Sequence, residues 1–305
     1  MTDTSNPLSD KRIGVFGKGG SGKSTVTVLL ARALVARGYD VCVLDADSTN
    51  VGLHRALGLD EPPVPLLDYF GGMVFSGGAV TCPVDDPTLL PDAAIPLSEL
   101  SDQYYVRSAE GILFLVAGKI GDQGPGSGCD GPVAKIARDL HILDSGAHPV
   151  TLIDFKAGFE DSARGAIISL DWALVVVDPT QAAIQMAADM KAMVAQIQGG
   201  RLPATHHLER PELVELANRL FTKASIRGVL FVLNRVQDME TEHYLKQTLA
   251  EKGIQPAGVF PHHSSVAAGW LKGMPIGHID LIEGAATIVA AFEAVVAMNS
   301  QQVSG

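Results

Sequence analysis

Cysteine is scarce in this sequence, and positive charge is outweighed by negative charge. Three cysteines among 305 residues exclude a disulfide framework and are typical of a protein from a reducing cytoplasm. Lysine and arginine number 23 against 34 acidic residues, which leaves a net charge of −11. This balance gives no large basic surface for nucleic acid, so a nucleic-acid partner is not expected.

Long apolar runs are also missing, although 47% of the residues are hydrophobic. Met1–Asp10 is polar and does not resemble a signal peptide, and we expect no apolar run that approaches the length of a membrane span. No lysine or arginine follows Lys272, so a basic amphipathic membrane anchor is not expected near the C-terminus. The expected class is a cytoplasmic globular protein without a membrane anchor.

The most informative stretch that is present is a glycine-rich loop with the pattern G-x-x-x-x-G-K-[ST]. It follows the apolar run Ile13–Phe16, which predicts a strand, and precedes apolar residues at helical spacing. In this context, backbone N–H groups converge on phosphate oxygens at a helix N-terminus. Lys23 would reach the β- and γ-phosphates, and the Ser24 hydroxyl would hold Mg²⁺. The residues predicted to bind nucleotide here are Gly17, Lys18, Gly19, Gly20, Ser21, Gly22, Lys23, Ser24 and Thr25.

Further apolar runs alternate with helical stretches along the chain. This alternation predicts a doubly wound α/β fold with a mainly parallel sheet flanked by helices. The expected strands are 13–16, 40–44, 112–117, 150–153, 172–177, 229–233 and 256–260. Polar residues follow several of them, at the edge where such sheets bind ligands.

We expect one domain over residues 12–298, with a disordered tail over 1–11 and a second tail over 299–305. Residues 60–111 form an insertion rich in proline and glycine, too long for a tight connection. It is expected to be either a lid or partner surface, or a decorated surface loop.

The loop K-G-G-x-G-K-S-T, with Lys18 after its first glycine, resembles the deviant Walker A loop of the MinD/ParA/nitrogenase iron protein superfamily. The resemblance implies an ATPase that forms a homodimer on binding ATP, in which Lys18 crosses to the partner's nucleotide. Lys18 and Lys23 would then be catalytic. The alternative for Lys18 is a solvated loop lysine.

Acidic residues at two strand ends match further superfamily elements. Asp45-Ala46-Asp47 resembles switch I, which implies that Asp47 orients the attacking water and that Asp45 lies near the Mg²⁺ shell. The stretch 154–158, D-F-K-A-G, resembles switch II, which implies that Asp154 binds Mg²⁺ through water and that the Gly158 amide senses the γ-phosphate. Each aspartate alone could instead cap a helix.

Asn234-Arg235 and the loop around Pro261 resemble the superfamily elements that lie beside the adenine base. The resemblance implies that these residues bind the base. No N-K-x-D sequence typical of GTPases is visible, so ATP is expected. The paired histidines 206–207 and 262–263 are interpreted as solvated surface.

Gly118-Lys119-Ile120, the stretch 128–132 (G-C-D-G-P) and the pattern 154–165 resemble the CooC family, nickel-insertion accessory ATPases of carbon monoxide dehydrogenase. This resemblance implies a role in metalloenzyme maturation, with a metalloenzyme as client. The family has a second cysteine where this chain has Gly131. Cys129 alone would supply two sulfurs per dimer for Ni²⁺ or Zn²⁺, or it would be a thiol packed at the dimer axis. Cys82 is a candidate spare ligand, and Cys42 is expected in the core.

Two alternative functions remain from the sequence. One is a ParA/MinD-like positioning ATPase, which the lack of a basic patch and a membrane helix disfavours. The other is a redox partner resembling the nitrogenase iron protein, which needs a second cysteine after switch II. This chain has none after Cys129.

Overall fold

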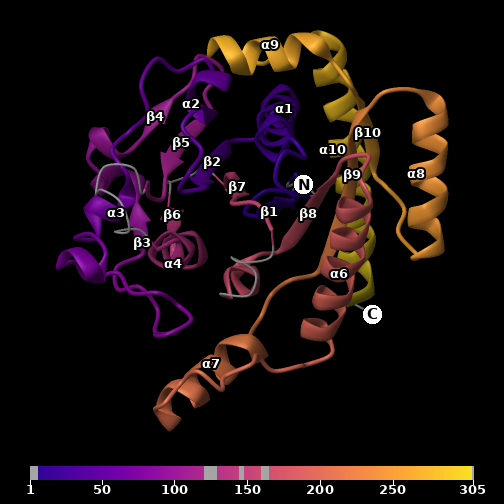
Figure 1. The fold of residues 1–305 in the computed structure, drawn as a ribbon. Coiled ribbons are helices and arrows are strands. Elements are labelled where there is room, and N and C mark those ends of the chain that lie inside the picture. The colour runs from indigo at the N-terminus through magenta and orange to yellow at the C-terminus, as the bar shows by residue number, and fades with distance from the viewer. Residues whose placement is uncertain (1–5, 120–128, 144–147, 159–164, 304–305) are drawn as a thin grey trace, which may run out of the picture.

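The computed structural model describes residues 6–119, 129–143, 148–158 and 165–303. Its centre is an eight-stranded sheet in the order β10-β9-β8-β1-β7-β2-β5-β4, parallel except for the pairing of β4 with β5 (Figure 1). The strands of this sheet are β1 Arg12–Gly17, β2 Val41–Ala46, β4 Val106–Arg107, β5 Leu113–Val116, β7 Val150–Phe155, β8 Trp172–Val177, β9 Gly228–Val236 and β10 Gly258–Pro261. The predicted fold class is confirmed.

Helices cover both faces of the sheet (Figure 1). They are α1 Lys23–Ala36, α2 Leu53–Ala56, α3 Leu66–Tyr69, α4 Gly131–Asp139, α6 Gln181–Gln198, α7 Pro211–Thr222, α8 Met239–Glu251, α9 Ser264–Lys272 and α10 Ile279–Val303. Short 3₁₀ turns lie at Val74–Ser76, Leu97–Glu99, Asp102–Tyr104 and Ala166–Ser169. A small second sheet pairs β3, Ala94–Pro96, with β6, His141–Leu143.

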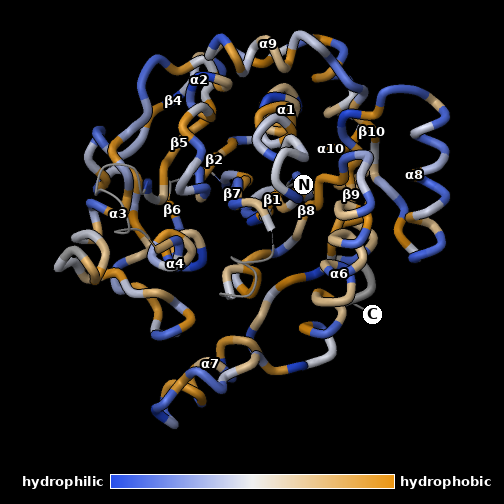
Figure 2. Tube along the Cα trace, in the orientation of Figure 1, coloured by the Kyte–Doolittle hydropathy of each residue, from blue (hydrophilic) through white to orange (hydrophobic). Residues whose placement is uncertain are grey.

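The continuous apolar strands are explained by two hydrophobic cores, one on each face of the sheet. Alternate residues of one strand enter different cores: Val15 packs under α1 and α10, whereas Phe16 packs toward α4 and α6. Phe16 stacks on Phe155 of the neighbouring β7 with ring centroids 4.7 Å apart. Figure 2 shows the strands as hydrophobic along much of their length, as expected for strands buried on both sides.

Residues 60–111 pack as a structured layer over α4 and are not a loose loop. The insertion contributes buried side chains to one core, among them Leu66, Met73 and Ile95, and β4 adds an edge strand to the main sheet. Every residue of α4 is buried, although the helix carries three charged side chains. Those charges are satisfied by the insertion, so α4 and the insertion depend on each other.

Polar contacts join α4 to the insertion. Lys135 Nζ donates to Thr81 Oγ1 at 2.7 Å, and Arg138 donates to the Thr88 carbonyl at 2.9 Å. The backbone N–H of Leu90 donates to Asp139 Oδ2 at 2.7 Å. Since a buried charge is costly without partners, these bonds fix how the insertion sits on α4.

The two ends of the described chain differ from the expected tails. Leu8 lies in the segment predicted as a disordered tail, yet it is fully buried in the core under α1. Helix α10 runs to Val303, past the predicted boundary at residue 298. The N-terminal end therefore contributes to the packed domain, and α10 is longer than predicted.

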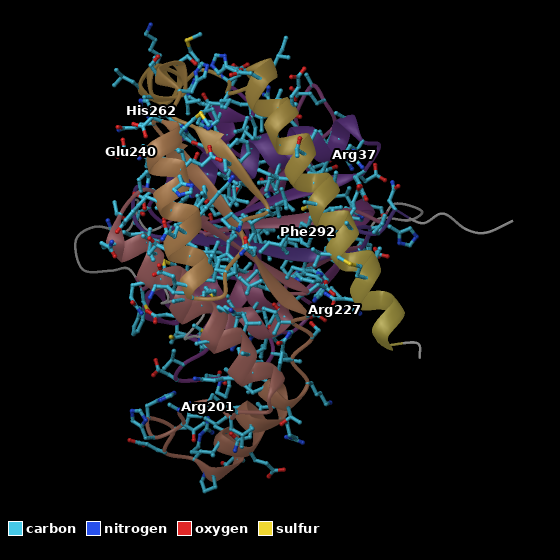
Figure 3. The ribbon with its side chains drawn as sticks, turned by 90° about the vertical axis from the view of Figure 1, so that its right-hand side faces the viewer. Arg37, Arg201, Arg227, Glu240, His262 and Phe292 are labelled. Carbon is cyan, nitrogen blue, oxygen red and sulfur yellow. The ribbon has the colours of Figure 1, made fainter. Side chains whose placement is uncertain are left out.

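Helix α10 corrects the expectation about apolar runs. Its stretch Ile279–Asn299 is long enough for a membrane span and has a mean hydropathy of 1.8. One stripe of the helix packs against α1 and β10. Phe292, labelled in Figure 3, lies edge-on to Trp172 with ring centroids 5.4 Å apart. The many alanines of the helix raise its mean hydropathy without forming a long run of large apolar residues.

Candidate functional site

The glycine-rich loop turns between β1 and α1 at the carboxyl edge of the sheet. Gly20 and Gly22 have φ of 81° and 88°, in the left-handed region that favours glycine. The end of β9 holds the loop from outside: Asn234 Nδ2 donates to the Ser21 carbonyl at 2.7 Å, and the Arg235 guanidinium donates to the Gly20 carbonyl. The loop is therefore fixed by its glycines and by a neighbouring strand.

Three side chains of this loop decide what it can bind. The Ser21 hydroxyl is buried and has no hydrogen-bond partner within the described part of the chain. Lys23 is buried close enough to Asp154 to lower the pKa of that carboxyl, against the larger effect of burial. Lys18 is half-buried and makes no side-chain hydrogen bond or ion pair among the described residues. A phosphate group would give the Ser21 hydroxyl and the two lysines anionic partners, so the loop fits a nucleotide phosphate.

Strand register brings the two predicted acidic elements together beside the loop. Asp154 of β7 lies between Val15 of β1 and Asp45 of β2. The Ser24 hydroxyl donates to Asp154 Oδ2 at 2.6 Å, and Asn50 Nδ2 donates to the Ser24 hydroxyl at 2.9 Å. Burial raises the pKa of Asp154 to about 6, because the charged form loses its hydration. A hydroxyl and a buried carboxylate are hard oxygen donors, so Ser24 and Asp154 fit Mg²⁺, which would favour the charged carboxylate.

Asp45 is engaged by Lys119, a residue that sequence reasoning did not include in the site. Lys119 Nζ lies 2.7 Å from Asp45 Oδ2 and donates to the Asp47 carbonyl at 2.6 Å. Burial raises the pKa of Asp45 to about 7, and Lys119 opposes this rise. The sequence predicts that Asp45 lies near the Mg²⁺ shell; in the structure its carboxylate pairs with Lys119, and Asp45 lies next to Asp154 across the two strands. The polar Lys119 after the strand Leu113–Val116 was the signal that could have identified this pair.

The Asp47 carboxylate shapes the turn that follows β2. Its Oδ1 accepts hydrogen bonds from the Thr49 backbone N–H at 2.9 Å and from the Thr49 hydroxyl at 2.7 Å. Asp47 N–H in turn donates to Asp45 Oδ1 at 3.1 Å. The half-exposed carboxylate therefore has a fixed orientation at the mouth of the site.

Gly158 lies directly against the phosphate loop. Its backbone N–H donates to the Gly17 carbonyl at 3.2 Å, and its φ of 99° is in the glycine-favouring region. A Cβ on Gly19 would lie 3.7 Å from the Ala157 methyl group. The segment predicted as switch II thus contacts the segment predicted to hold phosphate.

A cavity of about 470 Å³ opens beside the loop, where the sequence predicts an adenine site. It brings together Asn234, Arg235 and Pro261, the three residues predicted for the base. His262 and His263 also line this cavity; His262 is exposed, as predicted, and lies at the top of the molecule in Figure 3, whereas His263 is half-buried. The other predicted surface pair, 206–207, is exposed. The lining residues are Thr25, Leu29, Pro179, Asn234, Arg235, Gln237, Phe260, Pro261, His262, His263, Val266, Ala267, Trp270 and Leu281.

Thr25, which was predicted to bind nucleotide, has its hydroxyl engaged elsewhere. Trp270 Nε1 donates to Thr25 Oγ1 at 2.8 Å. This bond ties the start of α1 to α9, so the side chain of Thr25 supports the wall of the base cavity. Its contribution to phosphate binding would come from the backbone.

Asp130, next to Cys129, connects the two segments predicted as switch I and switch II. One carboxylate oxygen accepts a hydrogen bond from the Ser48 hydroxyl, and the other pairs with Lys156. Ser48 follows the 45–47 segment, and Lys156 follows Asp154. The start of α4 is thereby fixed to both acidic elements of the site.

The other parts of the predicted cysteine and switch motifs lie outside the described residues. These are Ile120, Gly128, Phe159, Glu160 and Arg164. Cys129 itself is half-buried, Cys82 is half-buried in the insertion, and Cys42 is buried in β2 as expected. Over the described ranges, no cluster of three or more His, Cys, Asp and Glu side chains is placed to hold a metal ion.

Comparison with protein families gives a match over residues 15–276 to the CobQ/CobB/MinD/ParA nucleotide binding domain. The chain belongs to this nucleotide-binding family. The resemblance to the MinD/ParA superfamily predicted from the loop is confirmed.

Two curated proteins are similar to this chain over most of its length. The carbon monoxide dehydrogenase accessory protein CooC of Rhodospirillum rubrum is 32% identical over 235 residues, 75% of this chain and 81% of that protein. An uncharacterized ATP-binding protein of Methanocaldococcus jannaschii is 28% identical over 264 residues, 86% of this chain and 92% of that protein.

A solved structure supports the fold of this CobQ/CobB/MinD/ParA family member. The septum site-determining protein MinD of Pyrococcus horikoshii, solved with Mg-ADP, superposes with a TM-score of 0.58. The alignment covers 95% of this chain and 98% of MinD, at 18% identity. At that identity the likeness shows the shared fold.

Proposed function

We propose that this protein is an ATP-hydrolysing switch that dimerises on binding ATP and acts in the maturation of a metalloenzyme. The observation that carries the proposal is the carboxylate of Asp130. It joins the two acidic segments beside the phosphate loop to the segment that contains Cys129. The CooC relative, an accessory protein of a metalloenzyme, supports the same assignment.

The residues of the site suit phosphoryl transfer, which depends on positioning and on charge stabilisation. Lys23 and the loop amides would hold the β- and γ-phosphates, and the cavity beside Asn234 would take the base. Bound Mg²⁺ would neutralise charge on the phosphates and would be held through Ser24 and Asp154. Lys119 would keep Asp45 charged and hold the 45–47 turn in place.

In the proposed cycle, Lys18 supplies its charge to the nucleotide of a second copy. Its side chain has no partner within the described part of one chain. A lysine held half-buried beside the phosphates and left without a partner is consistent with a contact made only in the dimer. ATP would then close the dimer, and hydrolysis would release it.

Replacing Asp47 with alanine tests the hydrolysis step. We expect the Asp47→Ala variant to bind ATP as well as wild type does but to lose turnover, because no carboxylate would orient the attacking water. The closed dimer should therefore accumulate with ATP alone, as measured by light scattering. Turnover at the wild-type rate would contradict the role of Asp47. Thr49→Val is a matched control, since it removes one bond to Asp47 and keeps the carboxylate.

Replacing Asp130 with asparagine tests the link between the nucleotide and the cysteine segment. The variant keeps the shape of the side chain but removes the charge that pairs with Lys156. We expect Asp130→Asn to bind ATP, while the reactivity of Cys129 toward a thiol reagent no longer changes when ATP is added. A nucleotide response equal to that of wild type would show that the coupling does not pass through Asp130.

Metal analysis of anaerobically purified protein, with and without ATP, tests the maturation role against the alternatives. Nickel or zinc content that depends on nucleotide is the expected result. ATP-dependent binding to DNA or to lipid vesicles without any bound metal would favour a positioning ATPase. An iron–sulfur absorption spectrum would favour a redox partner.

A further inference from the structure

Two of the three cysteines meet at one glycine, although they are far apart in the sequence. The backbone N–H of Gly131 donates to Cys129 Sγ at 3.3 Å. A Cβ added to Gly131 would lie 2.4 Å from Cys82 Sγ. Both sulfurs therefore border the same residue, one from the insertion and one from the segment that opens α4.

Gly131 is needed here for space. The Cβ of any other residue would also lie 2.6 Å from the Cβ and 2.9 Å from the Cα of Cys82. These distances are too short for real contacts, and the last involves backbone that cannot rotate away. The missing side chain at position 131 is what allows the Cys82 thiol to come beside Cys129.

Backbone amides lie near both sulfurs. The Gly131 N–H donates to Cys129 Sγ, and the amides of Val84 and Asp85 lie close enough to the Cys82 thiol to lower its pKa. The Asp85 N–H donates its hydrogen bond to the Cys82 carbonyl at 3.2 Å. Burial raises the pKa of the Cys82 thiol, these amides oppose the rise, and the neighbouring Cys129 adds to it. Amide donors stabilise sulfur in its thiolate form, the form that binds metal.

We propose that Cys82 and Cys129 of one chain together bind one thiophilic divalent metal ion of the Zn²⁺ or Ni²⁺ class. The sulfur of Cys82 takes the place near Cys129 that a side chain at position 131 would otherwise occupy. The site deepens the proposed function by naming where the ion is held, and it rests on that function for the ion's role as cargo.

The chemistry of two thiolates suits an ion that must be passed on. Soft thiolate ligands select Zn²⁺ and related ions over Mg²⁺, which takes oxygen ligands at the phosphate site. A tetrahedral ion held by two sulfurs keeps two coordination positions for exchangeable ligands. Closed structural sites have four protein ligands, so a two-thiolate site is the open kind from which an ion can leave.

The place of the pair connects it to the nucleotide. Cys129 is followed by Asp130, whose carboxylate is held by Ser48 and Lys156. Cys82 lies in the segment that bonds to Lys135 of α4 through Thr81. A movement of either switch segment would therefore shift one sulfur relative to the other.

Zinc titration of the nucleotide-free, reduced protein tests the proposal. We expect wild type to bind one Zn²⁺ per chain in competition with a chromophoric chelator, and Co²⁺ to give a thiolate charge-transfer band. Cys82→Ser and Cys129→Ser should each lose this binding and the band. Cys42→Ser is the matched control, because Cys42 is buried in β2 and should leave both signals unchanged. Binding that survives Cys82→Ser would overturn the proposal.

A glycine variant tests the geometry while both cysteines remain. Gly131→Ala should weaken Zn²⁺ binding by about 10- to 100-fold, as expected when a residue that positions ligands is changed. Gly284→Ala is its control, since a Cβ there makes ordinary contacts of 3.7 Å. Wild-type affinity in Gly131→Ala, with circular dichroism showing a folded protein, would overturn the proposal.

Because the titration uses no nucleotide, its result is separate from the ATPase assay. A protein that hydrolyses ATP but binds no Zn²⁺ at this pair would overturn the inference alone. A protein that binds Zn²⁺ here but does not hydrolyse ATP would overturn the proposed function alone.

Discussion

Replacing Lys23 with alanine is expected to remove tight ATP binding. Lys23 is buried at the first position of α1, in the loop whose glycines turn the backbone toward phosphate. A hydrogen bond to a charged group contributes about 1.5–3 kcal/mol, and each 1.4 kcal/mol is a factor of ten in affinity. We therefore expect the Kd for Mg-ATP, measured by calorimetry, to rise by about one to two orders of magnitude, with turnover lost.

The control for Lys23→Ala is thermal unfolding. ATP that binds only the native state raises the melting temperature of wild type and should not raise that of the variant. Lys272→Ala removes an exposed lysine of α9 and should retain the ATP-induced rise. If the Lys23→Ala variant is folded and ATP still raises its melting temperature as much as that of wild type, Lys23 does not hold the phosphates.

Replacing Lys18 with alanine is expected to separate binding from dimerisation. The variant should bind ATP nearly as well as wild type, because Lys23 and the loop amides remain. It should fail to dimerise, and its turnover should fall by about 10³- to 10⁵-fold, the range for a cation supplied in trans to phosphoryl transfer. Light scattering with a non-hydrolysable ATP analogue and a phosphate-release assay measure the two effects.

Lys18→Arg keeps the charge and provides the comparison for Lys18→Ala. Partial recovery of dimerisation by arginine would support a role for the charge itself. A Lys18→Ala variant that dimerises and hydrolyses ATP normally would make Lys18 a solvated loop residue. The Asp47→Ala variant, which should trap the closed dimer, provides the light-scattering signal of that dimer for comparison in the same assay.

The sheet could be predicted from sequence because its signals are local. Runs such as 172–177 are apolar throughout, and a strand buried on both faces needs that composition. The two-residue strand β4 and the small sheet of β3 and β6 were not predicted. Their pairing depends on how the insertion folds back, and short segments carry no periodic pattern of their own.

The positions of the glycine-rich loop and of the acidic residues beside it could be predicted, since each lies at a strand end whose place follows from the fold. The ion pair of Lys119 with Asp45 was missed because it forms between neighbouring strands that are distant in sequence. The meeting of Cys82 with Gly131 was missed for a similar reason: it depends on the tertiary packing of a proline-rich segment. In the sequence, Gly131 stands where the resembling family has a cysteine; in the structure, its missing side chain leaves room for the Cys82 thiol.

The dependence of α4 on the insertion has a consequence for the order of folding. The hydrogen bonds between them join residues 47 to 54 positions apart, and the insertion comes first in the chain. During synthesis, the threonines of the insertion are made before the lysine and arginine of α4. Their hydrogen bonds to these side chains can therefore form only after α4 has been synthesised. Contacts of long sequence separation form late, because closing the chain between them costs entropy. The contacts between the insertion and α4 close a shorter stretch of chain than the pairing of β1 with β7, in which Arg12 and Thr151 are 139 positions apart. We therefore expect the two sulfurs to come together before the parallel strands around β1 have paired.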